Sequence, residues 1–101
     1  MRLVYAPRAL RDIDKILALI AQQSVQGAHR VSLAIEHTIT VCAASPRGGS
    51  LTDEPGLYRW PLRAYRYTIF YRSDPAHEVV EIVRVVHSAR IRNLGRLPDE
   101  L

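Results

Sequence analysis

Residues 65–92 read YRYTIFYRSDPAHEVVEIVRVVHSARIR, and the predicted fold is built outward from these residues. Side chains alternate in character through residues 65–72, as they do in a strand with two different faces. Residues 79–86 are rich in β-branched side chains, which favour strands, and residues 73–78 have the composition of a connecting loop. The stretch therefore predicts an antiparallel hairpin. One face of its first strand would carry Tyr65, Tyr67, Ile69 and Tyr71.

The other face of that strand is partly cationic, because it carries Arg66 and Arg72. A turn centred near Pro75 would place Arg66 opposite Arg84 of the second strand. Like charges across a strand pair disfavour a sheet, so folding stability alone gives no reason for this arrangement, whereas an anionic partner would. The alternative is that each guanidinium reaches solvent along its alkyl stem.

Upstream of the hairpin, the sequence predicts a short strand and two helices. Residues 2–5 read as the strand, and Pro7 suits the first turn of a helix of about sixteen residues. A polar break at residues 22–27 contains a glycine of the kind that ends helices. A second helix then runs to about Ala44, and the short connection makes the pair an antiparallel hairpin. The apolar positions of the two helices are Leu10, Ile13, Ile16, Leu17 and Ile20, then Ala28, Val31, Ile35, Ile39 and Cys42.

The loop after the second helix contains Pro46 and the pair Gly48-Gly49, and we expect it to be a flexible surface loop. Residues 57–60 offer another strand, and residues 61–64 would connect it to the hairpin. The predicted fold is therefore α+β in the order β-α-α-β-β-β. A helical hairpin packs on one face of a small, mostly antiparallel sheet, with a short C-terminal helix or arm. We expect residues 1–101 to form a single domain.

Composition indicates an ordinary globular domain, with 101 residues, 48% hydrophobic and 24% charged. No apolar run approaches the roughly 20 residues that span a bilayer, and the N-terminus is interrupted too early to be a signal peptide. We therefore expect a cytoplasmic protein with no membrane partner. The single cysteine, Cys42, excludes an internal disulfide, and the four histidines share no ligand spacing, so we expect no metal and no cofactor.

The positive charge is concentrated in the C-terminal part of the chain. Residues 59–96 carry eight arginines and three acidic residues, within a total net charge of +4. Lys15 is the only lysine, and the planar guanidinium of arginine suits phosphate or carboxylate recognition better than an ammonium does. The same bias also arises from a GC-rich genome.

Three stretches together resemble the RelE/ParE superfamily of bacterial type II toxins. They are the strand YRYTIFYR at residues 65–72, the ending IVRVVHSAR at residues 82–90, and the helix entry PRALRDI at residues 7–13. The resemblance covers nearly the whole chain, including the order of its elements. It implies a toxin neutralised by a cognate antitoxin protein.

The RelE-like branch of the superfamily would make this chain a ribosome-dependent mRNA endoribonuclease. His87 would then serve as the acid or base, and Arg66 and Arg84 would clamp the phosphate. RelE-like members typically have a tyrosine in the C-terminal segment, but no tyrosine follows Tyr71 here. Their lysine-rich second helix and loop are also missing.

The ParE-like branch fits the ending of the chain better and implies an inhibitor of DNA gyrase. Such a toxin acts by binding, stabilising the cleaved gyrase complex, and has no catalytic residue. His87 has a second interpretation, as a capping or core residue at the end of a strand. The expected target contacts are Arg66, Arg72, Arg84, His87, Arg90 and Arg92.

The resemblance also implies a surface for the antitoxin. The two-helix face is the expected receiving surface, with Leu17, Leu19 and Val41 as apolar contacts. Arginines on the strands would meet acidic antitoxin side chains. A third possibility is direct binding of nucleic acid by the arginines and the nearby aromatic rings, which predicts a steep dependence on salt.

Overall fold

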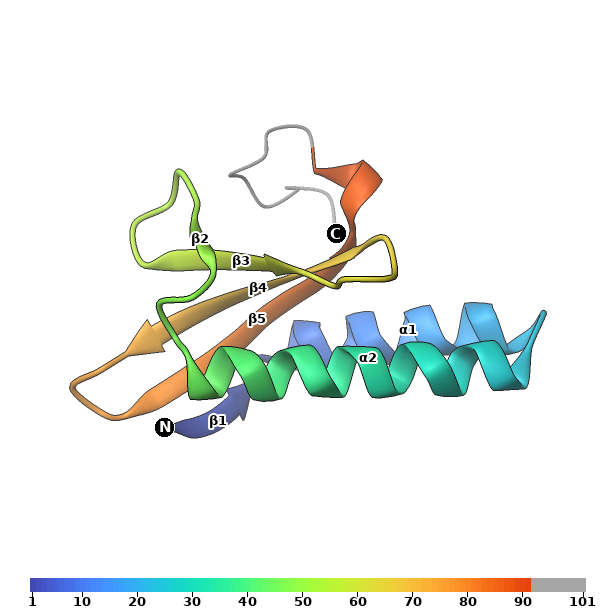
Figure 1. The fold of residues 1–101 in the computed structure, drawn as a ribbon, viewed down its shortest axis with the longest axis horizontal. Coiled ribbons are helices and arrows are strands. Elements are labelled where there is room, and N and C mark those ends of the chain that lie inside the picture. Colours follow the sequence, from blue (N-terminus) through green and yellow to red (C-terminus); the bar gives the residue numbers. More distant parts are fainter. Residues whose placement is uncertain (92–101) are drawn as a thin grey trace.

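The computed structural model describes residues 1–91, which form two layers (Figure 1). Two antiparallel helices, α1 (Pro7–Ala21) and α2 (Val25–Ala44), cover one face of a five-stranded sheet. A short 3-10 helix, η1 (Ser88–Arg90), follows the last strand. The predicted α+β architecture is confirmed. The strands are β1 (Arg2–Tyr5), β2 (Ser50–Leu51), β3 (Leu57–Pro61), β4 (Tyr67–Asp74) and β5 (Val79–His87).

The strands lie in the order β1-β5-β4-β3-β2, and all neighbours are antiparallel except β1 and β5. Parallel pairing needs a long connection, which the helices and the intervening strands provide. Strand β2 is a two-residue strand inside the segment that we expected to be a loop. No helix in residues 1–91 is both long enough and apolar enough to cross a bilayer.

The hairpin of β4 and β5 has a different register from the predicted one. Pairing continues to Asp74 and Val79, so the turn is shorter than expected. Tyr71 pairs with Ile82 but Phe70 pairs with Arg84, so Val83 is an extra residue that forms a β-bulge. The prediction that Arg66 lies opposite Arg84 is therefore wrong: Arg66 precedes β4, and Arg84 lies across from Phe70.

The predicted alternation of faces is confirmed by the core. Ile69 and Tyr71 are buried beneath the helices, while Phe70 is buried on the opposite face of the sheet. The core beneath the helices contains Ala9, Val31, Ile35, Ile39, Cys42, Leu62, Ile69, Tyr71, Val80, Ile82 and Val85. The smaller core on the other face contains Leu57, Phe70 and Val86, with Val83 and Ile91 packed against it.

Two details of the helices differ from the prediction. Leu10, placed on the buried stripe, is 48% exposed, and its neighbour Ala9 is buried instead. Gly27 does not end a helix, because its backbone N–H donates to Ser24 Oγ at 2.8 Å and lies in the first turn of α2. Ser24 is therefore the N-cap, and the polar break is only the short turn before it.

The glycine loop after α2 is tied to the sheet, contrary to the prediction of a flexible loop. The phenol oxygen of Tyr71 accepts a hydrogen bond from the Gly49 N–H at 3.0 Å and donates one to the Pro46 carbonyl at 3.1 Å. A Cβ atom on Gly49 would lie 2.4 Å from that phenol oxygen, and one on Gly48 would lie 2.7 Å from the Trp60 ring. A Cβ on Gly49 would also lie 2.7 Å from the Arg59 backbone carbonyl, so Gly49 requires glycine, whereas a side chain at Gly48 would displace the Trp60 ring.

Candidate functional site

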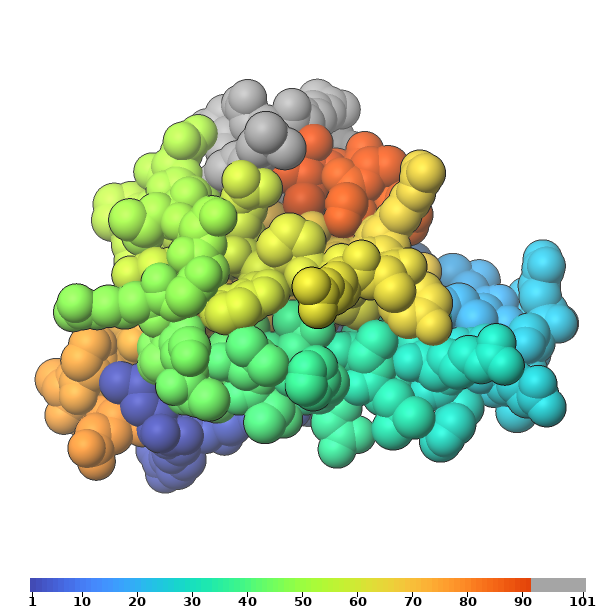
Figure 2. Space-filling view, in the orientation of Figure 1, coloured from blue at the N-terminus to red at the C-terminus, as the bar shows by residue number. Residues whose placement is uncertain are grey.

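The turn between β3 and β4 and the start of η1 meet at one end of the sheet. The Leu62 N–H donates to the Tyr67 carbonyl at 2.8 Å and closes the turn. The Ser88 N–H donates to the Arg66 carbonyl at 2.8 Å, and the hydroxyls of Thr68 and Ser88 lie 2.8 Å apart. These bonds hold the backbone of Arg66 beside the first residue of η1, and Figure 2 shows the two segments in contact.

This end of the sheet is cationic, and we name it the basic end: Arg63, Arg66, His87 and Arg90. The three arginines are exposed, whereas His87 is half-buried. Within residues 1–91, no carboxylate forms an ion pair with any of these arginines. An anionic surface can therefore contact them without first breaking an internal ion pair. Arg63 was not among the predicted residues, because its segment reads only as a connection.

His87 has a structural role at the basic end. Its Nδ1 accepts a hydrogen bond from the Ala89 N–H at 3.1 Å and so caps η1. Its ring packs edge-on against Tyr67, with the ring centroids 5.4 Å apart. This is the capping role that we considered for His87 as an alternative to target contact. Since the lone pair of Nδ1 is used by the cap, only Nε2 is left for an external group.

Arg84, predicted to be a target contact, lies inside the protein. Only 4% of the residue is exposed, and its guanidinium donates twice to Asp12 of α1, from Nε at 2.7 Å and from Nη2 at 2.9 Å. The Val85 N–H donates to the same carboxylate at 3.0 Å. Strand β1 pairs with β5 only as far as Ile82, so the Val85 N–H has no partner from β1. Asp12 accepts the hydrogen bond of this backbone N–H instead. Arg84 therefore joins α1 to the sheet and is not part of the basic end.

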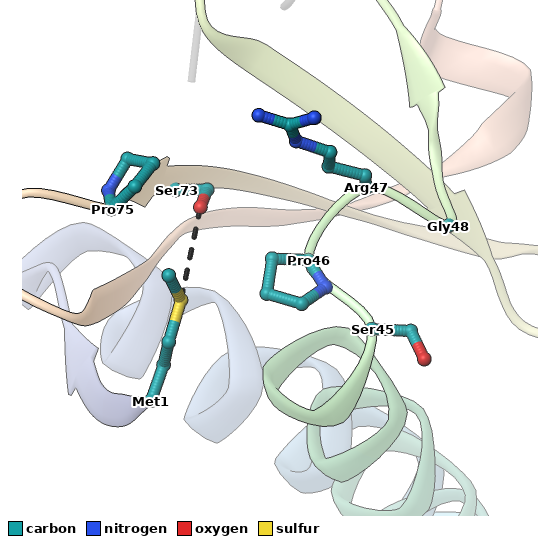
Figure 3. Close-up of a pocket in the computed structure, with 7 residues that line it drawn as sticks. All are labelled: Met1, Ser45, Pro46, Arg47, Gly48, Ser73 and Pro75. Atoms are coloured by element: carbon teal, nitrogen blue, oxygen red, sulfur yellow. Dashed lines mark hydrogen bonds between the residues drawn. The ribbon is translucent and has the colours of Figure 1, made fainter.

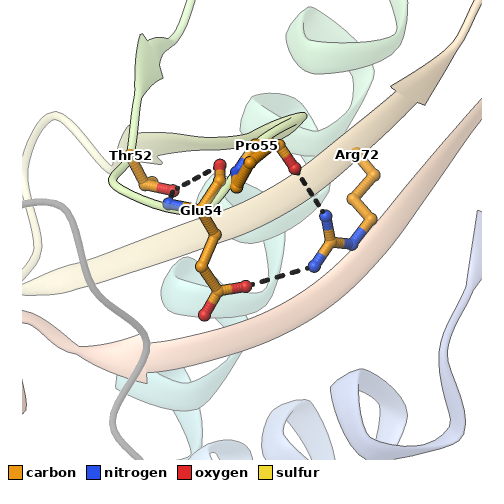
Figure 4. A network of polar contacts seen from close by, with 4 residues as sticks. All are labelled: Thr52, Glu54, Pro55 and Arg72. Atoms are coloured by element: carbon orange, nitrogen blue, oxygen red, sulfur yellow. Dashed lines mark hydrogen bonds and ion pairs between the residues drawn. The ribbon is translucent and has the colours of Figure 1, made fainter.

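Arg72 also lies apart from the basic end, toward the other end of β4. Its guanidinium forms an ion pair with Glu54 at 3.2 Å and donates to the Pro55 carbonyl at 3.2 Å (Figure 4). Of the six predicted contacts, three therefore gather at the basic end: Arg66, His87 and Arg90. Arg92 lies outside the described residues.

The three apolar residues expected on the helical face are exposed to different degrees. Leu19 is 56% exposed, whereas Leu17 packs partly against the core. Val41 is half-buried. Leu19 is therefore the residue of the three that presents most apolar surface to a partner.

Neither metal chemistry nor thiol chemistry has a visible site in residues 1–91. No group of three or more histidine, cysteine, aspartate or glutamate side chains is placed there to hold a metal ion. Cys42 is fully buried, and desolvation raises the pKa of its thiol to about 12. The guanidinium groups of the basic end are suited to the recognition of anions.

Solved structures of toxin–antitoxin systems share this fold. The chromosomal ParDE system of P. aeruginosa superposes with a TM-score of 0.73 at 17% identity, covering 86% of this chain and 95% of that chain. The intact RelBE complex of E. coli gives a TM-score of 0.61 at 21% identity, covering 83% and 92%. The RelBE2 complex of Mycobacterium tuberculosis gives 0.58 at 24% identity, covering 85% and 88%.

The family relationship follows from a sequence model rather than from these distant structures. No curated protein matches the chain. The family model described as the ParE toxin of the type II toxin-antitoxin system, parDE, matches residues 3–92, which is nearly the whole chain. This chain therefore belongs to the ParE toxin family of type II toxin–antitoxin systems.

Proposed function

We propose that this toxin inhibits DNA gyrase by binding to it in the cytoplasm and stabilising the complex in which the DNA is cleaved. The observation that carries the proposal is the basic end, where exposed Arg63, Arg66 and Arg90 have no acidic partner among residues 1–91. Guanidinium groups form paired hydrogen bonds with phosphates and carboxylates. A cleaved DNA–protein complex offers both kinds of group.

The competing ribonuclease mechanism needs His87, Arg66 and Arg84 to act on one phosphate. Arg84 is held by two hydrogen bonds to Asp12, and Nδ1 of His87 is held by the Ala89 N–H. Withdrawing Arg84 from its buried pair would leave the Asp12 carboxylate without its cation, which is costly in a protein interior. This geometry supports an inhibitor that works by binding and has no catalytic residue.

We further propose that a cognate antitoxin neutralises this chain by covering the helical hairpin. The solved ParDE and RelBE structures are described as toxin–antitoxin systems or complexes. Leu19 supplies an exposed apolar contact on α1 for such a partner. A complex with the antitoxin that left the helical hairpin uncovered would contradict this part of the proposal.

The test is a gyrase supercoiling assay with the antitoxin-free chain and an Arg66→Ala, Arg90→Ala double variant. The wild-type chain should block supercoiling and accumulate cleaved DNA. One charge-assisted hydrogen bond contributes about 1.5 kcal/mol, so losing even one contact should weaken inhibition about tenfold. An Arg8→Ala, Arg30→Ala variant removes the same charge from the helices, where both arginines are exposed, and should keep full potency.

Two further arms separate the alternatives. Cleavage of mRNA on translating ribosomes that disappears in a His87→Asn variant would overturn the proposal in favour of the ribonuclease. A DNA mobility shift without gyrase, titrated with salt, tests direct nucleic-acid binding, which should weaken steeply as salt rises. Folded wild-type chain that leaves gyrase unaffected would also overturn the proposal.

A further inference from the structure

A surface groove of about 330 Å³ lies at the end of the sheet remote from the basic end. It separates the loop after α2 from the β4–β5 turn and the first residue of the chain (Figure 3). In Figure 2 these segments appear in green, orange and dark blue at the lower left. The groove is lined by Met1, Ser45, Pro46, Arg47, Gly48, Ser73 and Pro75.

One wall of the groove is held rigidly. The Pro46 carbonyl and the Gly49 N–H both bond to the buried phenol of Tyr71, and the Gly48 N–H donates to the Ser45 carbonyl at 2.8 Å. The Trp60 ring of β3 lies close to Gly48 and supports the loop from the side of the sheet. The groove is therefore formed before any partner arrives, which lowers the entropic cost of binding.

The lining of the groove selects a particular chemistry. Met1, Pro46 and Pro75 give it an apolar floor and sides, and among residues 1–91 Arg47 supplies the only charged side chain of the lining. The guanidinium of Arg47 extends beside the groove in Figure 3, and within residues 1–91 it has no ion-pair partner. An aliphatic side chain next to a carboxylate complements this lining, and the net charge of +4 attracts an acidic segment.

We propose that this groove binds a short acidic-aliphatic segment of the antitoxin, with a leucine-like side chain between Pro46 and Pro75 and a carboxylate on Arg47. The inference rests on the proposed function only in taking the antitoxin as the source of the peptide. Because the groove and the basic end lie at opposite ends of the sheet, this segment anchors the antitoxin without touching Arg66 or Arg90. The part of the antitoxin that covers the helical hairpin is then a separate segment.

The experiment uses a fluorescein-labelled peptide of eight residues that alternates leucine with glutamate, titrated by anisotropy into the full chain. One control peptide replaces glutamate with lysine, and another replaces leucine with serine. The acidic leucine peptide should bind at least fivefold more tightly than either control. Amide chemical shifts should change at Gly48, Gly49 and Ser73 when it binds.

An Arg47→Glu variant should weaken the acidic peptide about tenfold. The matched control Arg30→Glu makes the same charge reversal on exposed α2 and should leave the affinity within twofold. No binding at 1 mM peptide, equal loss in both variants, or shifts confined to the basic end would overturn the inference. These assays contain no gyrase, so a chain that inhibits gyrase but fails here refutes the groove alone. A chain that binds the peptide but leaves gyrase unaffected refutes only the proposed target.

Discussion

The ion pair of Asp12 and Arg84 makes a specific prediction about stability. The side chains are only 16% and 5% exposed, so neither charge is well solvated in the folded protein. Replacing Asp12 with leucine leaves the guanidinium buried without its anion and removes the acceptor of the Val85 N–H. Breaking a buried pair in this way costs about 3–5 kcal/mol, against about 5–15 kcal/mol for the total stability of a small domain.

Removing both charges should be less harmful than removing one. An Asp12→Leu, Arg84→Met variant has no unpaired charge and retains apolar volume, leaving mainly the unsatisfied Val85 N–H, which costs about 1–3 kcal/mol. The double variant should therefore be more stable than Asp12→Leu alone. The matched control is Arg72→Ala, whose ion pair with Glu54 is 41% and 45% exposed and contributes under about 1 kcal/mol.

Urea unfolding followed by circular dichroism measures these differences. With a slope of about 2 kcal/mol per molar urea, Asp12→Leu should lower the midpoint by about 2 M. A loss of less than about 1 kcal/mol in Asp12→Leu would mean that the buried ion pair contributes little to stability. Additive losses from Asp12→Leu and Arg84→Met in the double variant would mean that the two groups do not interact.

Three further predictions concern single side chains. His87→Asn should keep η1 capped, because the asparagine amide oxygen can also accept a hydrogen bond from the Ala89 N–H. His87→Ala should shift the amide resonance of Ala89 and weaken the proposed gyrase inhibition more than His87→Asn does; equal effects of the two variants would contradict the cap. Burial raises the pKa of Tyr71 from 10.0 to about 12, so the folded state holds that proton more tightly. The protonated Tyr71 phenol therefore contributes stability that is complete below about pH 10 and is lost as the pH rises toward 12. In urea titrations at several pH values, Tyr71→Phe should lose less stability than the wild-type chain over this pH range. Cys42 should react with Ellman's reagent only as fast as the protein unfolds, because its thiol is buried with a pKa of about 12; rapid labelling of the native chain would contradict its placement.

Much of the fold was predictable because its signals are local. The alternation in residues 65–72 assigns each side chain to a face, and the core confirms it for Ile69, Phe70 and Tyr71. Pro7 and the spacing of apolar residues likewise located both helices within a few positions. A period of two residues in a strand, or of 3.6 residues in a helix, shows which side of that element is apolar without any knowledge of the element that packs against it.

The candidate site was less predictable, because several of its residues depend on contacts with distant parts of the chain. The sequence alone does not say whether an arginine in a strand pairs with an acidic residue of the same chain or of a partner. Nothing near Arg84 in the sequence indicates that its carboxylate partner is Asp12, 72 positions earlier. Arg63 had no signal beyond its position in a connection. It belongs to the basic end only because β3 and β4 turn back beside η1.

Motifs and short periods in the sequence were enough to place the chain in its family and to assign both helices, the strands other than β2 and the two faces of the hairpin. Which arginines are available to a partner depended on tertiary contacts. The extra residue Val83 shifts the register of β5, and Asp12 of α1 then holds Arg84 in the interior, while Arg66 and Arg90 stay exposed. A guanidinium is stable in the interior where its charge and its N–H groups are paired, and here packing between elements distant in the chain brings the Asp12 carboxylate to Arg84.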